Sequence, residues 1–118
     1  MQEFLILIHA QGDPREAMGP KVHQDHIRKV GEYIARLKEE GKFLAAQPLE
    51  LRGVLLEGSK GVVKDGPFNE TKEVVVGYYH ILAESLVEAV DIAKANPAFQ
   101  DFVAKMEVRP ILKEEGIN

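Results

Sequence analysis

The residues best suited to chemistry near neutral pH are the histidines, of which the chain has four. His23 and His26 are three positions apart, so a helix through them places both imidazoles on one face. A neutral imidazole is an effective general base near pH 7, and two rings one helical turn apart can share a metal ion. The alternative is that both rings belong to a partly buried apolar stripe. We assign no metal, because the chain lacks Cys and an HExxH pattern.

The predicted topology brings histidines together at one end of the sheet. A helix that follows the first strand and runs antiparallel to it begins beside the C-terminal end of that strand. His23 and His26 are therefore expected near His9, which makes three histidines at this end. Whether His80 joins them, from the C-terminal end of a parallel neighbouring strand, is left open by the sequence. His9 and His26 are accordingly the candidate general bases.

A second candidate site is a group of charged residues around a motif of turn formers. Asp65-Gly66-Pro67 favours a tight turn before the next strand. In a mixed cluster, an arginine can hold an anionic or carbonyl substrate while a carboxylate moves a proton. The alternative is an ion-pair and turn network with a structural role only. The side chains expected together at the other end of the sheet are Asp65, Glu70, Lys72, Glu73, Glu107 and Arg109.

The elements that position these residues follow from the hydrophobic pattern. The apolar run at 4–8 predicts a strand over 3–9 that is covered on both faces, and the Gly and Pro residues in 11–20 predict a loop. Apolar residues then recur at three- and four-residue spacing, which predicts a helix from Lys21 that stops at Gly41.

From residue 53 onward the sequence predicts four strands, two of them in a hairpin, and one helix. Ser85 with Glu88 has the spacing of a capping box, and Asn96-Pro97 ends the helix that it opens. In the last strand, Lys105, Glu107 and Arg109 alternate with apolar residues, as expected for a strand with one face more exposed to solvent. The predicted elements are a hairpin over 53–63 turning at 58–59, a strand over 73–82, a helix from 85 and a strand over 103–109.

This order of elements predicts one α+β domain over 1–118, with the split βαβ arrangement of a ferredoxin-like fold and an added β-hairpin. Two helices cover only one face of a four-stranded sheet. If the other face is apolar, a second subunit must cover it, so we expect a homodimer. Tyr78 and Tyr79 are expected on opposite faces of their strand, one in the core and the other toward the partner.

Composition narrows the classes of function. The chain has 15 Lys and Arg residues and 19 Asp and Glu residues, which gives a formal charge of −4. A negative protein repels the phosphate backbone, so nucleic-acid partners are disfavoured. The absence of Cys excludes disulfides and a thiolate nucleophile and suits a reducing compartment, so we expect a cytoplasmic location. The apolar run at 4–8 is too short to span a membrane and follows no basic leader, so neither a membrane partner nor export is expected.

Several motifs resemble one known family. The segment Lys64-Asp65-Gly66-Pro67-Phe68-Asn69-Glu70-Thr71-Lys72-Glu73, followed by Gly77-Tyr78-Tyr79 and Glu107-Val108-Arg109-Pro110, is similar to the signature of the DGPF group within the YCII-related family. The resemblance implies a dimeric α+β barrel, in which two ferredoxin-like sheets face one another and enclose a cleft. Some relatives are thought to be enzymes with a His and Asp pair, others resemble muconolactone-isomerase-type barrels, and some DGPF domains are linked to transcription initiation.

The pattern favours a small-molecule acid–base enzyme, of lyase or isomerase type, that works in the dimer cleft without an organic cofactor. The competing interpretation is a non-catalytic ligand- or protein-binding module, including an accessory role in transcription initiation. The candidate catalytic residues are His26, His9 and Asp65, and the candidate substrate-binding residues are His23, Glu70, Lys72, Glu73 and Arg109.

Overall fold

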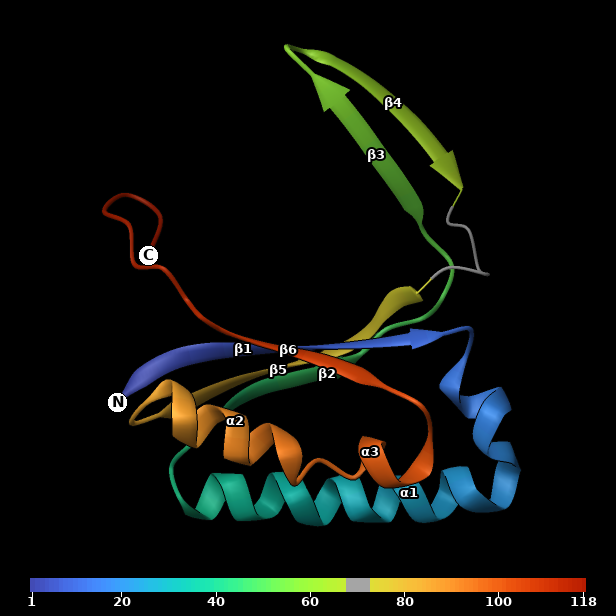
Figure 1. Cartoon of the computed structure of the whole chain (residues 1–118), viewed down its shortest axis with the longest axis vertical. Helices are drawn as coiled ribbons and strands as arrows, with labels where there is room; N and C mark the ends of the chain where they lie inside the picture. The colour runs from blue at the N-terminus through green and yellow to red at the C-terminus, as the bar shows by residue number, and fades with distance from the viewer. Residues whose placement is uncertain (68–72) are drawn as a thin grey trace.

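A computed structural model describes residues 1–67 and 73–118 and contains a four-stranded sheet, a separate two-stranded hairpin and three helices (Figure 1). The helices lie together on one side of the sheet (Figure 1). In chain order the elements are β1 (Gln2–Gln11), α1 (Pro14–Glu39), β2 (Phe43–Pro48), β3 (Val54–Ser59), β4 (Val62–Pro67), β5 (Glu73–Ala83), α2 (Leu86–Lys94), α3 (Ala98–Asp101) and β6 (Lys105–Pro110).

The sheet has the order β2-β5-β1-β6, and every neighbouring pair is antiparallel. β5 is thus inserted between β1 and β2, which run in the same direction. This arrangement confirms the predicted ferredoxin-like α+β fold with an added hairpin. It also shows that the expected parallel pairing of the strand bearing His80 with the first strand is wrong, because β5 runs opposite to β1.

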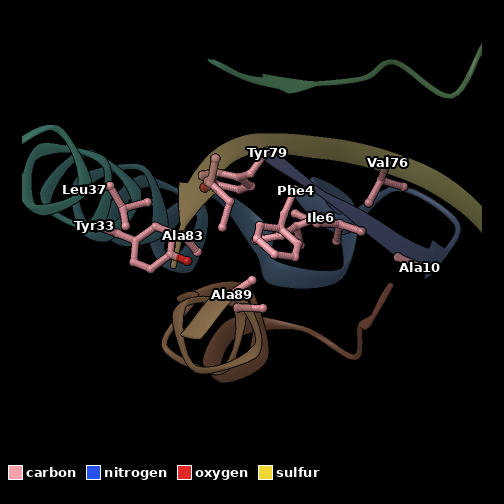
Figure 2. Packing of buried hydrophobic residues seen from close by; sticks show 12 residues of the cluster. Phe4, Ile6, Ala10, Tyr33, Leu37, Val76, Tyr79, Ala83 and Ala89 are labelled. Carbon is pink, nitrogen blue, oxygen red and sulfur yellow. The ribbon is translucent and has the colours of Figure 1, made fainter. Parts of the chain in front are cut away.

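The core lies between the sheet and the helices. Phe4 and Ile6 of β1 and Ile81 of β5 are fully buried, and they pack on the side where α1 and α2 contribute Tyr33 and Ala89 (Figure 2). The intervening residues of β1, such as Leu5 and Leu7, point to the opposite face and are only half-buried. The apolar run in β1 therefore has one fully covered face, not two.

The first helix begins earlier than predicted, at Pro14. Asp13 caps it by accepting a hydrogen bond from the Arg15 amide at 2.9 Å, and Pro14 suits the first turn because no hydrogen bond is needed from its nitrogen. Gly19, at φ 74°, kinks the helix at the residue before Pro20. The Gly and Pro residues of this segment therefore cap and bend a helix instead of forming a loop.

The hairpin differs from the prediction at its turn and at its second strand. The turn is at Lys60-Gly61, where both residues have positive φ (51° and 87°), as a two-residue type I′ turn requires. Asp65 pairs with Leu56 inside β4, so the expected turn at Asp65-Gly66-Pro67 is wrong. The hairpin projects on the side of the sheet away from the helices (Figure 1).

Two local predictions about the C-terminal half are confirmed. Ser85 caps α2 as predicted, because the Glu88 amide donates to Ser85 Oγ at 3.2 Å. The Glu88 carboxylate accepts from the amide of Glu84 at 3.1 Å, one residue before the position that a capping box uses. In β6, Lys105, Glu107 and Arg109 are exposed and the residues between them are half-buried. Among the described helices, none combines the length and apolarity needed to cross a bilayer.

Candidate functional site

A His–Asp pair joins two elements far apart in the sequence. His26 lies in the middle of α1 and Asp101 at the end of α3, and His26 Nδ1 is 2.6 Å from Asp101 Oδ2. Their side chains are 14% and 7% exposed, so water competes little for this hydrogen bond. The ring of Phe102 packs edge-on against the imidazole at 5.8 Å between centroids. The pair is held by packing as well as by hydrogen bonding.

The charge of Asp101 is stabilised by a second donor. Lys29, one turn after His26 on α1, places its Nζ 3.0 Å from Asp101 Oδ1. Burial by itself raises the pKa of Asp101, but the hydrogen bonds from His26 and Lys29 outweigh it and hold this pKa below its ordinary value. Asp101 is thus a carboxylate at neutral pH and accepts a hydrogen bond from the Nδ1–H group of His26. In a neutral imidazole, this leaves Nε2 as the acceptor nitrogen.

The imidazole of His26 lines a pocket of about 500 Å³ between α1 and the edge of the sheet formed by β2 and β5. The size is that of a typical small-molecule site. His23 and Arg15 line the same pocket. Most of the wall is apolar, with contributions from Ile8, Met18, Ile27, Val30, Ile34, Val76 and Phe102.

The expected meeting of three histidines at one end of the sheet is wrong. His9 alternates with Ile8 and Ala10, which are buried under the helices, so its ring lies on the face opposite to them. There its Nε2 is 2.7 Å from Glu107 Oε1. His80, on β5, lies opposite Leu5 of β1, near the N-terminal end of β1 and far from His9. Its Nε2 is 2.7 Å from Glu3 Oε1. Only His23 joins His26.

The expected charged cluster is also dispersed, because β5 and β6 are both antiparallel to β1. Glu73 lies opposite Gln11, where it accepts a hydrogen bond from Lys105 at 3.3 Å. Arg109 lies opposite Leu5, four positions along β6 from Lys105. Asp65 is exposed on the hairpin. Glu70 and Lys72 fall outside the residues that the structure describes.

The helix-free face of the sheet carries its own polar groups, and we call it the open face. Residues opposite one another in neighbouring strands point to the same face, which places Leu7, Tyr78 and Glu107 together there. Tyr79, next in sequence, is buried on the other face at 6% exposure. The two tyrosines thus point to opposite faces, as predicted. A cleft between facing sheets would lie on the open face, whereas His26 lies on the helix side.

Sequence patterns identified His26 but missed Asp101. α3 has four residues and no side-chain cap, so nothing in the sequence marks it as an element. In the parts of the chain that the structure describes, no three His, Cys, Asp or Glu side chains gather closely enough to hold a metal ion. The chemistry that the site offers is proton transfer by an imidazole beside an apolar pocket.

Comparison with known sequences places the chain in a family. A sequence profile of the YCII-related domain matches residues 4–113. An uncharacterized protein of Rhizobium meliloti (strain 1021) is 46% identical over 54 residues, an alignment that covers 42% of this chain and 40% of that protein. The chain thus aligns with less than half the length of that relative. The extent of the profile match shows that this chain belongs to the YCII-related domain family.

Proposed function

We propose that this protein is a small-molecule acid–base enzyme in which His26 is the general base. The observation that carries the proposal is the hydrogen bond from His26 to the largely buried Asp101 at the wall of an apolar pocket. The carboxylate orients the ring, stabilises the imidazolium formed when the ring takes a proton, and leaves Nε2 to act on a substrate. Asp101 is thus the carboxylate of the proposed site, whereas Asp65 is exposed on the hairpin.

The reaction class best supported is a lyase or isomerase step. Such a step needs a base to remove a proton and a group that stabilises the resulting negative charge, without an organic cofactor. Apolar walls strengthen these electrostatic interactions because they exclude water. Arg15, which lines the pocket, supplies a cation near its mouth, where its side chain is 58% exposed. Arg109 does not line the pocket.

The test is a comparison of matched histidine variants. A panel of small enolisable carbonyl compounds and lactones is incubated with the protein in heavy water, and proton exchange and product formation are followed by NMR. We expect His26→Asn to reduce the rate at least 100-fold, because general-base catalysis contributes on this order. His9→Asn, the same substitution on the open face, is the control and should leave the rate unchanged. Equal rates for wild type and His26→Asn would favour the non-catalytic binding module instead.

We infer that a second copy of the chain covers the open face. Leu5, Leu7 and Leu82 lie on this face and are half-buried within one chain, so they remain partly exposed to water. Leu56 and Val63 on the projecting hairpin are each 65% exposed. Apolar surface of this extent favours association, and two copies related by a twofold axis bury the same surface on both partners.

Sedimentation measures this association directly. We expect wild type to sediment as a dimer and Leu7→Glu as a monomer, because the substitution places a charge in the centre of the interface. Val103→Glu is the control, since Val103 is 93% exposed and lies before β6. A monomeric wild type, or a Leu7→Glu variant that remains dimeric, would contradict the inference. A circular dichroism spectrum checks that each variant is folded.

A further inference from the structure

The first turn of α1 is joined to the rest of the protein by two glycines. Gly12 precedes residues 13–18 with a φ of 70°, and Gly19 follows them with a φ of 74° and a ψ of 168°. The conformation of Gly19 is one that residues other than glycine rarely adopt. Pro20 then interrupts the hydrogen-bond ladder of the helix, because it has no N–H group. Residues 13–18 thus form a separate turn of helix, at a steep angle to the rest of α1 (Figure 1).

Few contacts hold segment 13–18 in place, and none of its residues is buried. Asp13 Oδ1 accepts hydrogen bonds from the Arg15 amide at 2.9 Å and from Arg15 Nε at 3.3 Å. Within residues 1–67 and 73–118, the side-chain hydrogen bonds of the segment are confined to this pair. Besides the His26 pocket, the segment borders a second hollow of about 540 Å³, which Pro14 and Ala17 line. A self-contained turn with so little packing around it can move as a unit.

The same segment forms part of the wall beside His26. Pro14, Arg15 and Met18 line the pocket that the imidazole lines. The side chain of His26 is only 14% exposed, although it borders a pocket large enough for a small molecule, so its access to solvent is restricted. Movement of segment 13–18 would widen the pocket at its mouth, where Arg15 lies.

We propose that segment 13–18 is a gate, closed in this structure, that opens by rotation about Gly12 and Gly19 to admit the substrate to His26. Lids of enzymes turn at a few residues that absorb the change in φ and ψ. An added Cβ at either glycine would meet no atom within 4 Å, so the positive φ, and not a lack of space, requires glycine there. The closed gate limits the entry of water, which favours proton transfer. The gate rests on the function proposed above only in taking this pocket as the substrate site.

Access to His26 is measured with diethyl pyrocarbonate, which acylates unprotonated imidazole rings, and mass spectrometry gives the rate at each histidine. Gly19→Ala places a side chain at positive φ and destabilises the closed position, so we expect His26 to react about 10-fold faster. Gly31→Ala is the matched control and should leave this rate unchanged, since Gly31 lies in the regular part of α1 and an added Cβ meets no atom within 4 Å. His80, on the open face, should keep its rate in both variants.

Methionine methyl groups report the motion in the wild-type protein without any ligand. Met18 lies in the gate and Met106 on β6, so we expect NMR relaxation dispersion on the microsecond-to-millisecond timescale at Met18 and a flat profile at Met106. A flat profile at Met18, an unchanged His26 rate in Gly19→Ala, or equal acceleration of His26 and His80 would each overturn the gate. A moving gate without turnover would remove the catalytic proposal alone, whereas turnover with a flat Met18 profile would remove the gate alone.

Discussion

Replacing Asp101 by Asn removes the negative charge beside His26 while preserving the shape of the side chain. The hydrogen bond from His26 at 2.6 Å is to a carboxylate that is 7% exposed, and bonds to charged groups contribute about 1.5–3 kcal/mol net. A neutral amide in the same place retains a bond of about 0.5–1.5 kcal/mol. We therefore expect Asp101→Asn to lower the free energy of unfolding by about 1–2 kcal/mol at pH 7.

The pH dependence of this loss has a defined sign. The folded-state pKa of Asp101 lies below its ordinary value, so the stabilisation is complete above the unfolded-state pKa of about 3.9. It disappears as the pH falls through the folded-state pKa. The difference in stability between wild type and Asp101→Asn should consequently stay constant from pH 6 down to about pH 4 and shrink as the pH falls further.

Urea unfolding followed by circular dichroism at several pH values measures both effects. Asp65→Asn is the matched control, because Asp65 is exposed on the hairpin and its replacement should change stability by less than about 0.5 kcal/mol. In a His26→Asn background the effect of Asp101→Asn should fall, since the two residues share one hydrogen bond. A loss no larger than that of the control, or one that is independent of pH, would show that the charge of Asp101 does not stabilise the fold through His26.

Two further predictions concern the scaffold. Ile6→Ala creates a cavity in a fully buried position of β1 and should cost about 2–5 kcal/mol in urea unfolding, whereas Leu112→Ala, at a position that is 73% exposed, should cost less than about 0.5 kcal/mol. Ser85→Ala removes the cap of α2 and should cost about 1 kcal/mol in thermal unfolding, and a smaller loss for Ser85→Gly would support a capping role.

Local patterns predicted the elements more accurately than their contacts. The cap of α2 by Ser85 and the alternation in β6 depend on residues a few positions apart, and both are confirmed. The direction of β5 depends on the whole topology. The split βαβ topology places β5 between β1 and β2, which both run opposite to it. His80, near the end of β5, therefore lies far from His9, near the end of β1. The wrong direction of β5 misplaced His80 and Glu73, whereas His9 was misplaced because its side chain points to the open face.

The sequence predicted the part of the site that depends on local spacing and missed the part that depends on distant contacts. Helical spacing placed His23 and His26 on one face, and both line the pocket. The partner Asp101 lies 75 positions after His26, at the end of a four-residue helix that has no side-chain cap. A helix this short is stabilised by its tertiary contacts, so no local signal marks it. The sequence predicted Asn96 only as a helix stop, and the structure adds that it is buried and accepts a hydrogen bond from the Ala98 amide.

The most direct test of the proposed site is an NMR titration of the protein, labelled at its histidine rings, with the panel of carbonyl compounds. We expect ligands to shift the His26 signals, and more weakly those of His23, while His80 on the open face is unaffected. Ligands that shift His9 and His80 but leave His26 unchanged would place the binding site on the open face and contradict a site at His26.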